Sequence, residues 1–350
     1  MKKTLLFTIA VFVMTACTGS RDTRLPKADN YRQHDPAVDS VLLGIRRLVA
    51  VDELHSIMIL KDGKKVLEYY DAGYGPDFLN ICWSASKTFT ATAVGFAVQD
   101  GLLTVEDRLI DHLRPEQLPE TVSDTLASLT IYDLLRMASG LRADPLGPTG
   151  GYGIENPTKY VLDRGFLFFP GEHFKYNSHN TYLLSAVVTN VTGKLVEDYL
   201  KEKLFTPLGI RNYHWDISPE GYNMGGWGLY ITTESLAKMG QFFLQKGQWN
   251  GRQLLDSKWI EAAMKPQIMQ YKGRGLSDEE IAALADDFRN QGYGYQMWCC
   301  AHNGARLDGA YGQWSVILPD ENAVIALTGH CLKTREEYQF IWDFLYPLVK

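Results

Sequence analysis

Apolar residues near both ends of the chain follow the two-residue period of β-strands. Residues 56–60 and 66–70 form two such runs, and Asp62-Gly63 between them is typical of a tight hairpin turn. Three further runs with strand-like patterns lie near the C-terminus, at residues 293–298, 312–318 and 323–328. The sequence therefore predicts strands from both ends of the chain.

Elsewhere the apolar positions recur at the three- and four-residue spacing of helices. The predicted helices span residues 37–49, 84–100, 131–137, 181–191, 233–244, 257–264 and 336–348. Between residues 102 and 225 there are few strand-like runs. We therefore expect an α+β fold, an α/β sandwich. In it, an antiparallel sheet built from both ends of the chain is flanked by helices and carries an inserted, mostly helical region.

This pattern also predicts how the 350 residues are organised. We expect a single folded domain over residues 37–350. Its α/β part would comprise residues 37–101 and 226–350, and its helical insertion residues 102–225. Residues 18–36 are polar and are predicted to form a tether.

The first seventeen residues have the features of an export signal. Lys2-Lys3 precedes an apolar run at residues 5–14, which is too short to span a bilayer comfortably. Residues 14–17 read Met-Thr-Ala-Cys, which resembles a bacterial lipobox. We predict a lipoprotein signal peptide over residues 1–17, with Cys17 lipidated and anchoring the chain to a membrane. The alternative is an ordinary secretory signal, and both interpretations place the protein outside the cytoplasm, in the periplasm or on the outer membrane.

Charge and cysteine content restrict the possible partners. The formal net charge of −6 argues against a nucleic-acid partner, which requires a basic face. The sequence contains neither a C-x-x-C nor an H-E-x-x-H motif, so we predict no metal and no cofactor. An exported chain permits disulfides, but the spacing leaves all three pairings open, as well as free thiols. The four cysteines concerned are Cys82, Cys299, Cys300 and Cys331.

Residues 84–87 read Ser-Ala-Ser-Lys, an S-x-x-K motif at the start of a predicted helix. Positions i and i+3 share a helix face, so the Lys87 amine can reach the Ser84 hydroxyl. A serine becomes a good nucleophile only when a neighbouring base takes its proton. About one such motif is expected by chance in a chain of this length, and a second copy, Ser235 to Lys238, is present. The flanking residues must therefore distinguish the two copies.

The flanks of Ser84 resemble those of the β-lactamase-related serine hydrolases. This group includes class C β-lactamases, DD-peptidases, esterases and aminohexanoate-oligomer hydrolases. The resemblance extends over about residues 37–349 and assigns the second S-x-x-K copy to a structural segment. It is carried by WSASKTFT at 83–90, LLRMASGL at 134–141, PGEHFKYNS at 170–178, GGWGLYITTESLA at 225–237 and DGAYGQ at 308–313.

The resemblance implies roles for individual residues. Ser84 would attack a carbonyl carbon and form an acyl-enzyme, with Lys87 accepting its proton. Tyr176 would share the work of the base and protonate the leaving group, which for a phenol requires nearby positive charge. Backbone N–H groups of Ser84 and Ala310 would form the oxyanion hole.

Two departures from the family pattern concern substrate binding. The family often has Asn two residues after the tyrosine, whereas here Asn177 and Ser178 follow, and either could orient the substrate or Lys87, or cap a loop. In the third motif, β-lactamases carry a cation that binds the substrate carboxylate, whereas this chain has Asp308-Gly309. An acidic residue there would repel a carboxylate. The sequence therefore favours ester or amide hydrolysis over β-lactam hydrolysis.

We thus expect a serine hydrolase that acts through an acyl-enzyme on an ester, amide or peptide bond. Its substrate would be a small molecule or a peptide, with cell-wall-derived peptides as one candidate. Two alternatives remain at this point. The first is a true β-lactamase or DD-carboxypeptidase, and the second is a catalytically silent lipoprotein that binds the cell wall.

Overall fold

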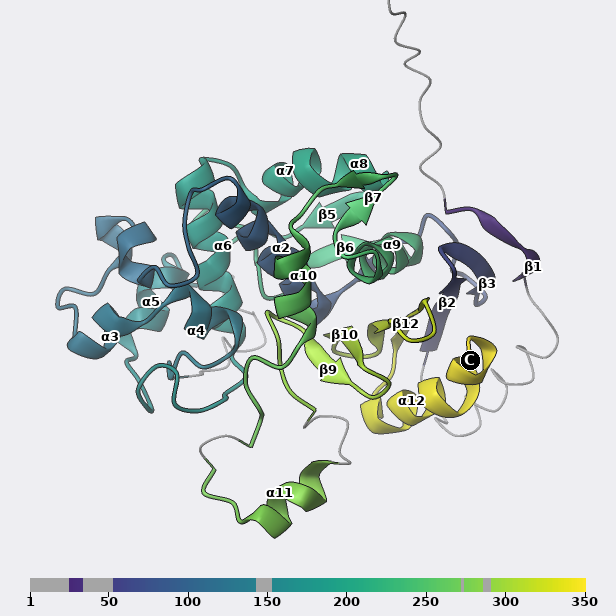
Figure 1. The fold of residues 1–350 in the computed structure, drawn as a ribbon. Coiled ribbons are helices and arrows are strands. Elements are labelled where there is room, and N and C mark those ends of the chain that lie inside the picture. Colours follow the sequence, from purple (N-terminus) through teal and green to yellow (C-terminus); the bar gives the residue numbers. More distant parts are fainter. Residues whose placement is uncertain (1–24, 34–52, 143–152, 272–273, 286–290) are drawn as a thin grey trace, which may run out of the picture.

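The computed structural model describes residues 25–33, 53–142, 153–271, 274–285 and 291–350. Within these ranges a seven-stranded sheet has the strand order β1-β3-β2-β12-β11-β10-β9 (Figure 1). Its strands are β1 (Lys27–Gln33), β2 (Glu53–Lys61), β3 (Lys64–Tyr70), β9 (Trp298–Cys300), β10 (Gly304–Gly309), β11 (Gln313–Leu318) and β12 (Ala323–His330). Early and late parts of the chain meet where β2 pairs antiparallel with β12. The predicted antiparallel sheet built from both ends of the chain is therefore confirmed.

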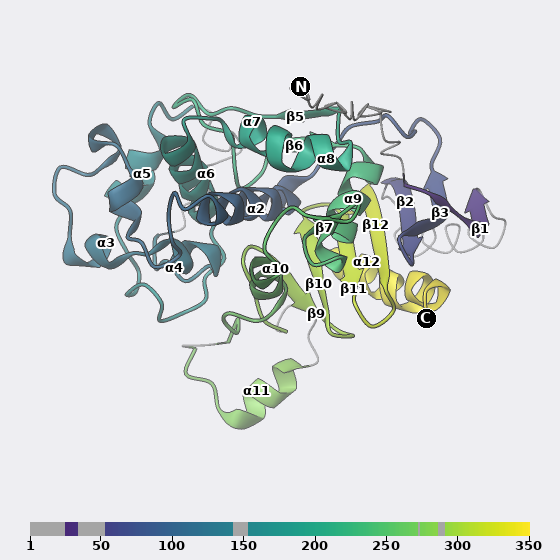
Figure 2. The same ribbon diagram turned by 45° about the horizontal axis from the view of Figure 1, so that its top comes forward.

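Alternation along the central strands gives the sheet two apolar faces. On β2, Met58 and Leu60 belong to one buried cluster, and Ile57 and Ile59 belong to another. Apolar residues of α9 (Thr233–Leu244) fill the first cluster, and those of α12 (Thr334–Phe340) fill the second. The two helices cover opposite faces of the sheet (Figure 2), which makes the sandwich that the pattern predicts.

A mostly helical region adjoins the β9 edge of the sheet (Figures 1 and 2). The remaining helices are α2 (Ser86–Gln99), α3 (Asp124–Ser128), α4 (Ile131–Leu135), α5 (Pro157–Asp163), α6 (Ser178–Thr192), α7 (Val196–Leu200), α8 (Thr206–Leu208), α10 (Ser257–Met264) and α11 (Asp278–Ala285). Single 3₁₀ or π turns are η1 (Trp83–Ala85), η2 (Leu109–His112), η3 (Pro115–Gln117), η4 (Lys201–Phe205), η5 (Ile341–Leu345) and η6 (Tyr346–Leu348). Helix α2 is buried along most of its length, so it joins this region to the sheet.

Two predictions about strands are wrong. The tether predicted at residues 18–36 includes residues 27–33, which instead form β1 and pair in parallel with β3 at the edge of the sheet. A polar edge strand lacks alternating apolar residues, and β1 is held by backbone pairing and by Tyr31, whose hydroxyl donates to Glu68. The predicted strand at 293–298 is mostly irregular, with Gln296 at φ +57°, and the strands lie just beyond it as β9 and β10.

Short strand pairs were not predicted because runs of two or three residues carry no periodicity. They are β4 (Asn80–Ile81), β5 (Tyr213–Trp215) and β6 (Leu229–Ile231) in one sheet, and β7 (Gln248–Trp249) with β8 (Arg252–Gln253) in another. Strand β4 leads directly into η1, and its pairing with β6 fixes the chain just before Ser84.

The predicted helix at 37–49 and the signal peptide with Cys17 lie outside the described residues. Among the residues that are described, every helix is too short or too polar to cross a lipid bilayer.

Candidate active site

Ser84 lies in the turn η1, immediately before helix α2. Trp83, which precedes it, has φ +44°, in the left-handed region that costs a residue with a Cβ roughly 1–2 kcal/mol. The Lys87 amine donates hydrogen bonds to Ser84 Oγ at 2.9 Å and to the Gly226 carbonyl at 2.6 Å. The S-x-x-K spacing thus brings the two side chains together as predicted.

Lys87 is buried, with 1% of its surface exposed. Burial penalises the charged amine and lowers the pKa of Lys87 to about 7, although the Asp308 carboxylate partly opposes this shift. Near neutral pH a large fraction of the amine is therefore neutral. The charged amine donates to both Ser84 Oγ and the Gly226 carbonyl. Once neutral, the amine can still donate to Gly226 while its lone pair accepts the proton of Ser84.

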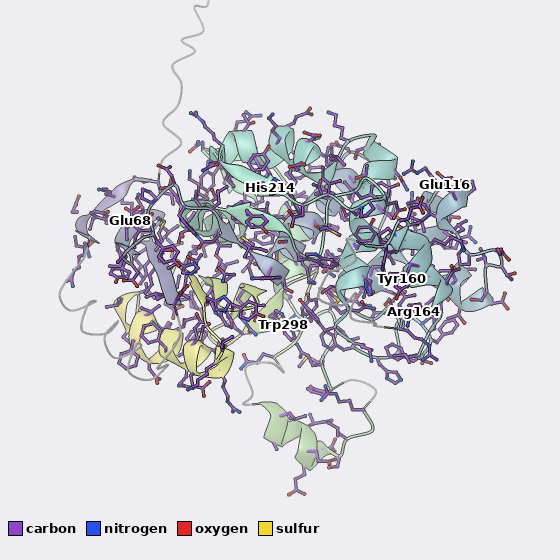
Figure 3. The ribbon with its side chains drawn as sticks, turned by 180° about the vertical axis from the view of Figure 1, so that it is seen from behind. Glu68, Glu116, Tyr160, Arg164, His214 and Trp298 are labelled. Carbon is purple, nitrogen blue, oxygen red and sulfur yellow. The ribbon has the colours of Figure 1, made fainter. Side chains whose placement is uncertain are left out.

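Tyr176 shares a hydrogen bond with Ser84. The Lys87 amine lies 5.0 Å from the centre of its ring, and Trp298 stacks against the ring with a centroid distance of 5.6 Å. Trp298 lies near the junction of the sheet and the helical region (Figure 3). Burial raises the pKa of Tyr176, and the nearby Asp308 carboxylate raises it further. Lys87 lies close enough to supply positive charge, but burial and Asp308 together hold the pKa of Tyr176 above its usual value.

The end of strand β10 approaches the nucleophile turn. A Cβ atom on Gly309 would lie 2.2 Å from the Cys82 carbonyl oxygen, so only glycine fits there. Gly309 pairs with Gln313 on β11, and Ala310 is the exposed first residue of the turn between the strands. The backbone of Ala310 thus follows directly on this close approach to the Ser84 turn.

Asp308 lies on the same strand and forms an ion pair with Arg306. The Arg306 Nε donates to Asp308 Oδ2 at 3.0 Å, and Nη1 donates to the Cys299 carbonyl. Arg306 is 1% exposed, and its guanidinium lies over the rings of Trp298 and Trp314. Burial raises the pKa of Asp308, while Arg306 and Lys87 oppose that rise. The third-motif position therefore holds a carboxylate whose charge is matched inside the protein.

The two candidate substrate contacts after Tyr176 differ in position. Asn177 is 3% exposed, and its side-chain oxygen accepts from the His179 N–H and so caps α6. Its amide nitrogen donates to the Leu141 carbonyl. Of the two roles that the sequence left open, the structure shows the capping role for Asn177. Ser178 is half-buried and packs against Gly226, the residue that accepts from Lys87.

The second S-x-x-K motif has different surroundings. Ser235 lies in the first turn of α9, where its hydroxyl contacts Thr232, the N-cap residue. Lys238 is buried but pairs with the Glu234 carboxylate at 3.0 Å. The amine of the second motif is thus held by a carboxylate, whereas the Lys87 amine donates to Ser84.

Three residues of this site were not identified from the sequence. Gly226 is 139 residues from Lys87, and no local pattern connects them. Trp298 was placed in a predicted strand without a role. Arg306 carried the clearest signal, because residues i and i+2 of a strand share a face and Arg306 precedes Asp308 by two.

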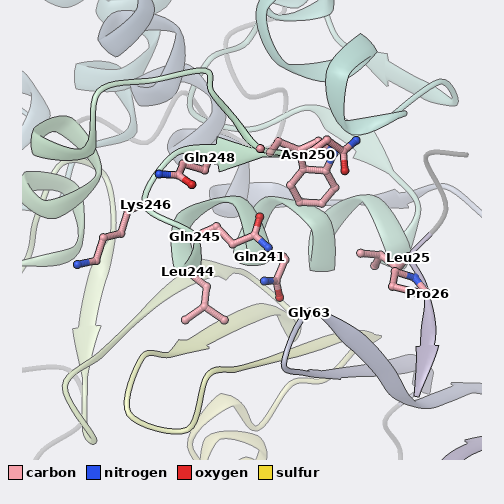
Figure 4. Close-up of a pocket in the computed structure, with 11 residues that line it drawn as sticks. Leu25, Pro26, Gly63, Gln241, Leu244, Gln245, Lys246, Gln248 and Asn250 are labelled. Carbon is pink, nitrogen blue, oxygen red and sulfur yellow. The ribbon is translucent and has the colours of Figure 1, made fainter. Parts of the chain in front are cut away.

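No group of three or more His, Cys, Asp or Glu side chains within the described ranges could hold a metal ion. Cys82, Cys299, Cys300 and Cys331 are buried free thiols. A pocket of about 550 Å³ lies elsewhere, between the C-terminal half of α9 and the β7–β8 hairpin (Figure 4). Ser84, Lys87 and Tyr176 are not among the residues that line it.

Sequence comparison relates the chain to known proteins over most of its length. The family model described as beta-lactamase matches residues 54–345. The 6-aminohexanoate-dimer hydrolase of Paenarthrobacter ureafaciens is 23% identical over 288 residues, which cover 77% of this chain and 71% of the relative.

Two solved structures share the fold at low sequence identity. A Bacillus anthracis protein, provisionally described as a 6-aminohexanoate-dimer hydrolase, superposes with a TM-score of 0.74 at 18% identity, covering 93% of this chain and 88% of its own. EstCE1, described as a hydrolase with promiscuous acyltransferase activity, superposes with a TM-score of 0.67 at 15% identity, covering 89% of this chain and 98% of its own.

Proposed function

The chain belongs to the β-lactamase family and is a serine hydrolase, and from this premise we propose that it cleaves an ester or amide bond through an acyl-enzyme on Ser84. The observation that carries the proposal is the buried Lys87 amine, 2.9 Å from Ser84 Oγ and with its pKa lowered to about 7. An amine with that pKa can accept a proton at neutral pH, which an exposed lysine cannot do.

The proposed reaction has two halves. In the first, Ser84 Oγ attacks the carbonyl carbon while its proton passes to Lys87, and the N–H groups of Ser84 and Ala310 stabilise the oxyanion. The carbon–leaving-group bond then breaks. Tyr176 donates its phenol proton to the departing atom, and the proton held by Lys87 restores the phenol. In the second half, water attacks the acyl carbon and gives one proton to Lys87. The bond between the acyl carbon and Ser84 Oγ then breaks, Lys87 returns the proton to Oγ, and the carboxylic acid is released.

The carboxylate of Asp308 at this position favours substrates that carry no carboxylate beside the reacting bond. β-Lactams and peptides with a free C-terminus carry one, and the Asp308 carboxylate would repel it. Arg306 pairs with Asp308 and is itself buried, so this position offers no exposed cation that could bind such a carboxylate. The relatives named for aminohexanoate-dimer and ester hydrolysis fit this proposal better than a β-lactamase or a DD-carboxypeptidase does.

The location of the protein is also a proposal. We propose that the chain is exported and anchored to a bacterial membrane by lipid on Cys17, because residues 1–17 have the features of a lipoprotein signal. The substrate would then be met outside the cytoplasm. A silent binding protein is disfavoured because it would not need a buried lysine beside a serine.

The test is hydrolysis of p-nitrophenyl butyrate by the chain from Arg21 onward, with a chromogenic cephalosporin in parallel. We expect ester hydrolysis that Ser84→Ala removes and Ser235→Ala, the matched control in the second S-x-x-K motif, leaves intact. Cephalosporin turnover comparable to ester turnover would favour the β-lactamase alternative. Equal activity of Ser84→Ala and wild type would exclude the proposed mechanism.

A further inference from the structure

Aromatic side chains on one side of Ser84 form a rim, which we define as Trp83, Tyr311 and His330, together with Leu332, which follows His330 by two residues in the chain. Trp83 directly precedes the nucleophile, and its ring meets the edge of Tyr311 with a centroid distance of 5.5 Å. Tyr311 in turn stacks on His330 at 4.6 Å with the two rings nearly parallel. The rim therefore begins at the nucleophile turn and continues outward over adjacent rings.

Backbone contacts fix the rim in place. The Cys331 N–H donates to the Tyr311 carbonyl, which ties the end of β12 to the β10–β11 turn. Leu332 follows and is 65% exposed, an unusually high value for a large apolar side chain. Trp83 and Tyr311 both have φ in the left-handed region, at +44° and +61°. Non-glycine residues persist in such conformations where the surrounding structure enforces them, and they cluster at binding sites.

The order of the strands places the rim opposite Tyr176. Gly309, at the end of β10, lies against the Cys82 carbonyl beside Ser84. Trp298, which stacks on Tyr176, belongs to β9 on one side of β10. His330, which stacks on Tyr311, belongs to β12 on the other side. Ser84 thus has Tyr176 on one side and the rim on the other.

We propose that the rim is the binding site for an apolar or aromatic acyl group of the substrate. The inference rests on the proposed function, because there Tyr176 protonates the leaving group. If the leaving group lies on the Tyr176 side, the acyl group lies on the rim side. Aromatic rings and an exposed leucine gain free energy when an apolar group removes them from water.

The test is an acyl-chain series at constant leaving group: p-nitrophenyl acetate, butyrate and phenylacetate. Each methylene group placed on the rim should raise kcat/KM by roughly two- to fourfold. Butyrate has two more methylene groups than acetate, so its kcat/KM should be higher by roughly tenfold. Tyr311→Asn, whose side chain tolerates a positive φ, and Leu332→Ala should each reduce this ratio at least threefold. Tyr311→Phe keeps the ring and should keep the ratio.

Controls separate the rim from general effects. Phe344→Ala removes another exposed aromatic residue, which stacks on Phe340 and is not part of the rim, and should leave the ratio unchanged. Varying the alcohol at constant acyl group, from methyl to butyl butyrate, should give a preference that Tyr311→Asn does not alter.

The outcomes distinguish the two proposals. An active wild type with no chain-length preference, or a preference that Tyr311→Asn and Leu332→Ala leave intact, would overturn the acyl site alone. A wild type that cleaves no ester, or a Ser84→Ala variant that cleaves them equally well, would overturn the proposed function and the acyl site with it.

Discussion

Gly309 and Cys82 are in such close backbone contact that the 2.2 Å left for a Cβ atom on residue 309 excludes every side chain. Cys82 precedes Ser84 by two residues, and Gly309 precedes Ala310, the proposed oxyanion donor. The contact therefore sets the spacing between the nucleophile and the strand that would supply the second N–H group. The pairing of β4 with β6 holds the backbone that leads into the turn.

Gly309→Ala should reduce kcat/KM by on the order of 100-fold, because a displacement of about 1 Å in a catalytic constellation has that effect. The displaced atom is backbone, so no side-chain rotation relieves the clash. Gly75→Ala is the matched control, since a Cβ there meets nothing within 4 Å. Ester kinetics of the two variants would check this, and near-wild-type activity of Gly309→Ala would mean that the contact does not position the site.

The pH dependence of kcat/KM should report the titration of Lys87. Activity should rise with pH and level off above an apparent pKa of about 7, because only the neutral amine accepts the Ser84 proton. The raised pKa of Tyr176 predicts no decline at mildly alkaline pH. A rate that is constant from pH 5 to pH 8 would contradict the role of Lys87.

Asp308→Asn should shift the acid limb of that profile to lower pH. The Asp308 carboxylate raises the pKa of Lys87, so removing its charge lets burial lower that pKa further. Asp163→Asn, an exposed change on α5, should leave the limb in place. The position of the limb does not depend on the fraction of active protein, so a loss of stability cannot imitate the shift.

Lys87 should also make stability depend on pH. Its pKa is about 7 in the folded protein and about 10.4 in the unfolded chain. Between these values the unfolded chain binds more protons, so stability rises with pH. Relative to Lys87→Met, wild type should gain about 2–3 kcal/mol in unfolding free energy from pH 7 to pH 9. Urea unfolding of both proteins measures this, and parallel pH profiles would refute the buried titration.

Long periodic segments were predictable from the sequence, and contacts between distant residues were not. Residues 233–244 and 257–264 are helices at the predicted bounds because one apolar face of each packs on the core. The β1 strand was missed because its pairing depends on the backbone rather than on apolar side chains. Ser84 and Lys87 could be paired because one helical turn separates them.

The electrostatic state of the site needed the tertiary structure. The sequence indicated that Lys87 could reach Ser84, but the depth of its burial depends on α6, β6 and the Gly225-Gly226 segment folding around α2. The same holds for Asp308, whose charge is matched by Arg306. The same holds for Tyr176, because its raised pKa results from burial and from Asp308, and the sequence motif reveals neither.

The central claim, that Ser84 is the nucleophile, is tested most directly by mapping a covalent adduct. A fluorophosphonate reacts with an activated serine by forming an O–P bond and releasing fluoride, and peptide mass spectrometry then locates the label. We predict one label for each chain, on Ser84, absent in Ser84→Ala and retained in Ser235→Ala. Stoichiometric labelling of any other residue, or an ester-hydrolysing protein in which Ser84 stays unlabelled, would contradict the account.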